Sequence, residues 1–300
     1  MFNILTPHSL NIKGNEDLII SGNVVYISKN ITLNGNLIIL KGGSLTLINS
    51  TLYFNNIEKQ GYYLKVMPGG TLIVNSSIIT GPKDKFYTIF IHHNTTFILY
   101  NSTIKNAGWK DQSNNGKYLW IGPAYTNDYS TFGHGLEINT TVTLFRNNIL
   151  ENIASIRFYS SNNIIEDNHI KNFRHEGLAF MPTSNNNTIR NNIIINASSL
   201  KRETYRIRFY PGNKNQKIYN NIIRRTVIGI AVSLIPPWTT GENFDIYNNS
   251  ISEVFNALLA RLKNSRIHDE NYTLMASQGI LIAASQNVII EIWIQHTLKK

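Results

Sequence analysis

Four residues of this 300-residue chain that could act as an acid, a base or a cation lie between positions 137 and 208. A carboxylate stands at Glu137, an imidazole at His175, and guanidinium groups at Arg157 and Arg208. Lyase chemistry on an acidic sugar needs a base to remove a proton and a cation to neutralise the sugar carboxylate, for which arginine is well suited. We therefore predict that these four residues are the catalytic groups.

Further charged and aromatic residues flank these four positions. Aromatic rings suit the apolar faces of sugars, and arginine forks suit uronate carboxylates. A long stretch rich in Trp and Tyr precedes the strand of Glu137, and could form a wall on the same side. The predicted substrate-binding residues are Trp109, Trp120, Tyr125, Arg174, Glu176 and Arg206.

A repeat positions these residues. Its pattern is an apolar residue, two further residues, Asn or Ser, one residue, and then Ile or Leu. Leu47–Leu52, Ile73–Ile78 and Leu99–Ile104 are early copies. In the second half the polar position is Asn, and stacked amides can bond to one another because each has a donor and an acceptor. The predicted column is Asn147, Asn168, Asn192, Asn221 and Asn249.

Between successive copies lies a second short segment in which apolar residues alternate with others, often after Gly. Gly135–Ile138, Gly177–Phe180 and Gly229–Val232 are examples, and Ile156–Phe158 and Ile207–Phe209 match without the Gly. This alternation is typical of strands, and the segments are too short for helices. The sequence therefore predicts an all-β, single-stranded right-handed parallel β-helix, a solenoid of about ten turns with an Asn ladder.

The ends and one insertion interrupt the repeat. We expect an N-terminal cap over residues 1–13, the solenoid over 14–286 with an insertion at 108–133, and a C-terminal strand and tail over 287–300. The strand at the C-terminal end is very apolar. If its edge is uncovered, homo-oligomers could form through it.

These repeats resemble the pectin lyase-like right-handed β-helix superfamily, and more closely its carbohydrate-binding and sugar-hydrolase repeats. The resemblance implies that a polysaccharide lies along the outer face of the first strand of each turn. If the Gly-containing segments are that strand, the outward positions are Phe90, Glu137, Arg157, Ala179, Arg208 and Ala231. We then expect Glu137 and Arg157 to be about 5 Å apart, and Arg157 and Arg208 to face solvent on one wall.

Two known chemistries of that superfamily fit poorly. Gly133-His134-Gly135 and Arg206-Ile207-Arg208 resemble elements of the polygalacturonases, but the catalytic Asp elements expected before them are absent. Calcium-dependent lyases need an acidic cluster on successive turns, and Glu137 has no acidic neighbours in its frame. We therefore predict no metal site and no cofactor.

The net charge of the chain indicates which class of partner it binds. The chain has 28 Lys and Arg against 18 Asp and Glu, a net charge of +10, which favours an acidic polysaccharide or a cell-surface glycan. Nucleic acid is not expected, because no basic run is interleaved with aromatics. The sequence shows neither a signal peptide nor a membrane span, and we expect an extracellular or surface-associated protein.

Two functions stay open from the sequence. In the first, the chain binds an anionic, uronate-type polysaccharide along the outer face of the solenoid and either only binds it or cleaves it, as a polysaccharide lyase or glycoside hydrolase. In the second, it is a non-enzymatic structural or adhesive β-helix of a cell surface or virion. The second is favoured by the missing carboxylate pairs and the neutral polar surface.

Overall fold

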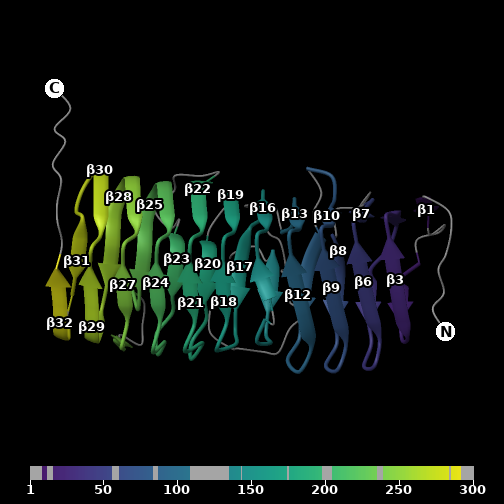
Figure 1. The fold of residues 1–300 in the computed structure, drawn as a ribbon, viewed down its shortest axis with the longest axis horizontal. Coiled ribbons are helices and arrows are strands. Elements are labelled where there is room, and N and C mark those ends of the chain that lie inside the picture. The colour runs from purple at the N-terminus through teal and green to yellow at the C-terminus, as the bar shows by residue number, and fades with distance from the viewer. Residues whose placement is uncertain are drawn as a thin grey trace, which may run out of the picture.

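The computed structural model describes residues 9–11, 16–55, 61–83, 87–108, 135–142, 144–173, 176–197, 205–234, 239–283 and 285–291. In these residues the chain winds as a parallel β-solenoid, with its coils stacked along the long axis from β1 to β32 (Figure 1). Every strand pairing is parallel, since each coil lies directly on the one before it. The predicted fold class is confirmed, and the number of turns is close to the predicted ten.

Each coil contributes strands to three faces, which we call faces 1, 2 and 3 in chain order. Face 1 consists of β2 (Leu18–Ile20), β5 (Leu37–Ile39), β8 (Tyr62–Val66), β11 (Tyr87–Ile91), β14 (Leu136–Ile138), β17 (Ser155–Phe158), β20 (Glu176–Phe180), β23 (Tyr205–Phe209) and β31 (Ile280–Ile282).

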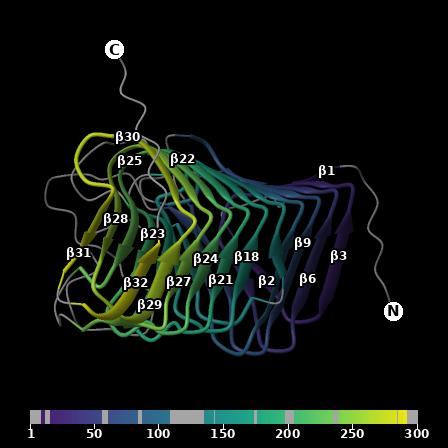
Figure 2. The same cartoon turned by 60° about the vertical axis from the view of Figure 1, so that its left-hand side comes forward.

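Face 2 is seen with its strands side by side in Figure 2. It consists of β3 (Asn23–Ile27), β6 (Ser44–Ile48), β9 (Thr71–Asn75), β12 (Thr96–Tyr100), β15 (Leu144–Arg146), β18 (Ile164–Glu166), β21 (Thr188–Arg190), β24 (Lys217–Tyr219), β26 (Gly241–Glu242), β27 (Asp245–Tyr247), β29 (Leu262–His268) and β32 (Gln286–Glu291).

Face 3 consists of β1 (Ser9–Asn11), β4 (Asn30–Leu33), β7 (Thr51–Phe54), β10 (Ile78–Thr80), β13 (Thr103–Lys105), β16 (Ile149–Glu151), β19 (His169–Phe173), β22 (Ile193–Ala197) and β30 (Asn271–Met275). Two 11-residue strands, β25 (Ile222–Val232) and β28 (Ser250–Ala260), run around the corner from face 3 to face 1. Strand β1, within the expected N-terminal cap, already pairs with β4.

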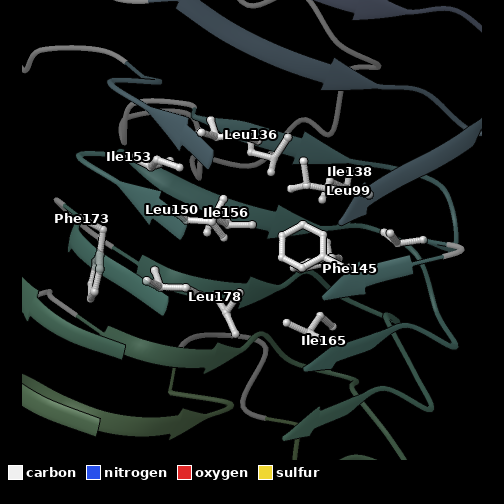
Figure 3. Close-up of a cluster of buried hydrophobic side chains, with 14 of the residues drawn as sticks. Leu99, Leu136, Ile138, Phe145, Leu150, Ile153, Ile156, Ile165, Phe173 and Leu178 are labelled. Carbon is white, nitrogen blue, oxygen red and sulfur yellow. The ribbon is translucent and has the colours of Figure 1, made fainter. Parts of the chain in front are cut away.

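The core is a set of columns of inward side chains, one residue per coil. On face 1, Leu136 pairs with Ile156, and both side chains are fully buried. Beside them the rings of Phe158, Phe180 and Phe209 stack at centroid distances of 5.2 and 4.8 Å. Side chains from all three faces meet in this interior (Figure 3). The period-2 alternation of the sequence points every second residue of a strand inward, and because these residues are apolar, the columns are buried.

A column of polar side chains fills the bend between faces 2 and 3. The Oδ1 atom of Asn192 accepts hydrogen bonds from the backbone N and from Nδ2 of Asn168, each at 3.0 Å, and Asn192 bonds to Asn221 in the same way. The full column is Ser50, Ser77, Ser102, Asn148, Asn168, Asn192, Asn221, Asn249 and Glu270.

The predicted ladder is confirmed at four of its positions and wrong at Asn147. The buried member of that coil is Asn148, whereas Asn147 lies outside the column with a φ of 56°. Because the inward residues of this coil are Phe145 and Leu150, the true frame starts one residue later than the one chosen from Leu144 and Ile149. Two adjacent asparagines made both frames fit the pattern.

The bend between faces 1 and 2 holds a second ladder, which the sequence analysis missed. Asn163 donates from its backbone N and from Nδ2 to Oδ1 of Asn187, at 3.0 and 2.8 Å. Asn187 in turn donates its backbone N to Gln216. All three side chains are fully buried, so this corner is also held by side-chain bonds between coils.

Removal of one ladder amide should destabilise the fold. Asn192→Ala leaves the backbone N and the amide of Asn168 without their acceptor inside the protein, and a buried unsatisfied group costs about 1–3 kcal/mol. We expect the free energy of unfolding to fall by about 2–4 kcal/mol, measured by denaturant titration. The control is Asn23→Ala at an exposed position of β3, and an equal loss in both variants would contradict the role of the ladder.

The last member of the column makes stability depend on pH. Burial raises the pKa of Glu270 from 4.5 to about 7, although hydrogen bonds from Asn249 oppose this shift. A raised folded-state pKa stabilises the protein below pH 4.5, and this contribution is lost as the pH rises through 7. Glu270→Gln keeps the acceptor without the charge.

We therefore expect the wild type to lose about 2–3 kcal/mol of stability between pH 4.5 and 8 relative to Glu270→Gln. The free energy of unfolding of both proteins, measured across this range, tests the expectation. Parallel pH profiles would show that Glu270 does not titrate in this window.

Candidate functional site

A column of outward side chains runs up face 1, one per coil. The strand register places Phe90 beside Glu137, Glu137 beside Arg157, and Arg157 beside Ala179, and then continues to Arg208 and Ala231. The predicted order of this column is therefore confirmed. Because every pairing is parallel, Glu137 and Arg157 meet although they lie on different coils.

These side chains do not face solvent, contrary to the sequence-based expectation. Arg157 is only 2% exposed and Glu137 8% exposed, and the Arg208 side chain is 11% exposed. An outer apolar group lies over this part of the face, in which Tyr159 packs against Ala179, Met181 and Tyr210. The arginines are thus on a common wall, but the aromatic residues that follow each strand enclose them.

The enclosed charges pair with one another across four successive coils. Arg157 Nε lies 3.3 Å from Glu176 Oε2, and Arg157 Nη1 lies 3.8 Å from Glu137 Oε1. Arg208 Nη1 donates to Glu176 Oε1 at 3.1 Å. Two carboxylates therefore balance two guanidinium groups.

Two tyrosines complete this group. Tyr210 donates its hydroxyl to Glu176 Oε1 at 2.7 Å. Tyr159 forms side-chain hydrogen bonds with Glu137 and Arg157. We call the whole group the face-1 cluster, which consists of Glu137, Arg157, Tyr159, Glu176, Arg208 and Tyr210.

Two rings fix the position of Arg208. Its guanidinium carbon lies 4.3 Å from the centroid of Tyr205 and 4.4 Å from that of Tyr210. Such contacts attract the cation to the ring faces and hold the planar fork in one orientation. Arg208 is the more exposed of the two arginines in the cluster.

The protonation states follow from burial and from these partners. Burial favours the neutral form of Arg157, but the carboxylates of Glu137 and Glu176 outweigh it and hold its pKa above the usual value. Burial and then the Glu176 charge raise the pKa of Tyr210, and burial and then Glu137 raise that of Tyr159. Both phenols are therefore neutral at physiological pH, and Tyr210 donates a hydrogen bond to Glu176.

A β-bulge brings Glu176 into the cluster. The register between β17 and β20 pairs Ser155 with Glu176 and then Arg157 with Ala179, so β20 has one extra residue. That residue is at a crowded corner, because a Cβ atom on Gly177 would lie 2.6 Å from the carbonyl oxygen of Arg206. The bulge turns the Glu176 side chain to the outer side, where it contacts Arg157 below and Arg208 above.

Arg206, predicted to bind substrate, is instead enclosed at the corner of the solenoid. It is 0% exposed, its guanidinium lies 4.2 Å from the ring centroid of Phe173, and Nη2 donates to the carbonyl oxygens of Arg224 and Arg225. Burial lowers its pKa to about 9. This placement differs from the outward position expected for Arg206, because the bulge of β20 continues into β23 and the residue before Ile207 does not follow the simple alternation.

The sequence analysis missed Tyr159 and Tyr210, although a signal for them existed. The tetrapeptide Ile-Arg-Phe-Tyr occurs twice, at 156–159 and at 207–210. A repeated outward Arg followed by an inward Phe and a Tyr indicates that the Tyr lies in the same place on both coils. Five predicted residues, Trp109, Trp120, Tyr125, Arg174 and His175, lie outside the described residues.

Among the residues that the structure describes, no three His, Asp or Glu side chains gather in a way that could hold a metal ion. The same residues contain no helix long and apolar enough to cross a membrane.

Solved structures with the same fold include carbohydrate-active enzymes. A double mutant of the periplasmic alginate epimerase AlgG aligns at a TM-score of 0.58 and 10% identity, over 96% of this chain and 73% of its own. The alginate lyase AlyF-OU02, in complex with G6, aligns at 0.50 and 16% identity, over 92% and 71%. PfbA, a surface adhesin of Streptococcus pneumoniae, aligns at 0.41 and 12%, over 94% and 84%. At these identities the likeness to the epimerase and to the lyase establishes the fold alone.

The sequence itself was also compared with known proteins and families. The search of curated proteins found no match. The family described as the right handed beta helix region matches residues 36–223, which is more than half of the chain and contains every member of the face-1 cluster. The chain therefore belongs to the right-handed β-helix family.

Proposed function

We propose that this protein binds an anionic, uronate-type polysaccharide along face 1, with the face-1 cluster at the centre of the binding surface. One observation carries the proposal, namely four charged side chains enclosed on the outer side of a solenoid. Removing charges from water costs several kcal/mol per ion, and the core does not require charges there. Such enclosed charge networks mark functional sites more often than ordinary surface.

Arg208 is the residue best placed to contact a ligand. It is the more exposed of the two arginines, and the ring contacts of Tyr205 and Tyr210 orient it. A guanidinium has five donors, and the Glu176 contact uses one nitrogen, Nη1. The remaining donors suit a sugar carboxylate, and the net charge of +10 favours approach of a polyanion.

The cluster favours binding over cleavage. Its tyrosines are neutral donors, and both carboxylates lie within 4 Å of a guanidinium. Two known proteins of this fold act on alginate, as an epimerase and a lyase, so the scaffold is compatible with uronate polymers. By analogy with the periplasmic epimerase we propose an extracellular or surface-associated location.

A second candidate function has its own support. The two arginines and two glutamates of the cluster compensate one another, which also suits a non-enzymatic structural or adhesive surface. In that case the network would only rigidify face 1 and would need no uronate ligand. The two functions differ in what happens when Arg208 is replaced.

Arg208→Met keeps much of the side-chain volume but removes the charge and the donors. Because a hydrogen bond to a charged group contributes about 1.5–3 kcal/mol, we expect the dissociation constant for alginate or polygalacturonate oligosaccharides to rise at least about tenfold. Isothermal titration calorimetry measures the change. Arg146→Met is the matched control, because Arg146 lies on face 2 and pairs with Asp167 outside the cluster.

The results of these titrations distinguish polysaccharide binding from the structural function. Equal weakening in both variants would show nonspecific attraction to the basic protein and would contradict the proposed site. Binding without unsaturated or epimerised products, followed by ultraviolet absorbance and NMR, would identify a binding protein. If the wild type binds no uronate oligomer saturably, the result would contradict the proposal and favour the structural function.

A further inference from the structure

A groove opens on face 3, away from the face-1 cluster. It has a volume of about 340 Å³ and is lined by Ile193, Ile195, Asn196, Ile222, Arg224, Arg225 and Glu253. Small-molecule sites have volumes of about 300–1,000 Å³. The groove is therefore of the size that takes one small ligand rather than a long polymer.

Its floor is apolar, whereas the three preceding positions of the same row are charged. Further down face 3, the outward side chains of Lys105, Glu151 and Lys171 form ion pairs at 3.4 and 3.6 Å. The next position in this register is Ile195. Ile193 on the same strand is 38% exposed, so both outward positions of β22 are isoleucine.

The apolar floor continues into the next coil. Ile222 pairs with Ile193 in the register of β22 and β25 and is only partly buried. Three isoleucine side chains on two neighbouring coils therefore form one apolar strip. The core does not need it, because the inward positions of the same strands are filled by Ile194 and Ile223, which are fully buried.

Two arginines lie at one side of this strip, and among the described residues only Arg225 pairs with a carboxylate. Arg225 Nε lies 2.9 Å from Glu253 Oε2. Arg224 is exposed and forms no ion pair with any of the residues that the structure describes. The backbone of both arginines is held in place, because Arg206 donates to their carbonyl oxygens.

We propose that this groove binds a single-chain amphiphile with a carboxylate head, of the fatty acid class. The alkyl chain lies over Ile193, Ile195 and Ile222, where it removes exposed apolar surface from water. The carboxylate pairs with Arg224, whose planar fork suits a carboxylate oxygen pair. Among the described residues that line the groove, Arg224 is the positive charge without a carboxylate, and it matches a head group with one negative charge.

The probe is decanoate, used below its critical micelle concentration, with decyl maltoside as an amphiphile of equal chain length and uncharged head. Titration calorimetry and NMR on the full chain measure binding. We expect saturable 1:1 binding of decanoate to the wild type. Arg224→Gln should raise the dissociation constant of decanoate at least about fivefold and leave that of decyl maltoside unchanged.

The Ile193→Thr/Ile195→Thr variant tests the floor and keeps β-branched residues in the strand. We expect this variant to have dissociation constants for both amphiphiles that are at least about tenfold higher than those of the wild type. Ile149→Thr, an exposed isoleucine elsewhere on face 3, and Arg146→Gln are the matched controls and should bind decanoate as the wild type does. Thermal unfolding of each variant shows that the fold is retained.

Two outcomes would overturn the inference: decanoate binding that does not saturate, or binding that Arg224→Gln and the double Thr variant leave unchanged. Competition with a uronate oligosaccharide separates this groove from the face-1 site. Decanoate should still bind when the oligosaccharide is present. Displacement by it would place both ligands at one site and contradict a separate groove.

Discussion

The bond that one coil makes to the next through a buried side chain is the constraint on which the remaining structure depends. From Ser50 to Glu270, the polar residue in the bend between faces 2 and 3 accepts the backbone N–H of the coil before it. This bond fixes the register, since a shift by one residue would turn every side chain to the other side of its face. With the register fixed, the inward apolar side chains of successive coils align in columns and pack together in the interior.

The face-1 cluster exists because that register holds. Glu137 and Arg157 are 20 residues apart in the chain but lie side by side on adjacent coils. A single extra residue in β20 brings Glu176 between Arg157 and Arg208, where neither regular alternation nor chain proximity would place it. The tyrosines beside them exclude water, so each ion pair is stronger than on the surface, and each charge depends on its partner.

Face 1 and face 3 use arginine in different ways. On face 1 the guanidinium groups are enclosed and balanced by glutamates, so a ligand must compete with partners already present. On face 3, Arg224 is exposed beside an apolar strip and has no carboxylate among the described residues. Arg206 lies between the two at the corner and donates to the backbone of Arg224 and Arg225. The long strand β25 carries this connection from one face to the other.

The sequence by itself determined the β-helix and the order of the outward column from Phe90 to Ala231. These follow from local periodicity, which the stacked fold preserves. Only the tertiary structure decided that Asn148 and not Asn147 joins the ladder, that Arg206 turns into the corner, and that Arg157 is buried. Those outcomes depend on a one-residue frame, a bulge and aromatic side chains from other coils. Period-2 alternation predicts on which side of a strand a side chain lies. It does not reveal an inserted residue, and it does not show which other side chains cover that side chain.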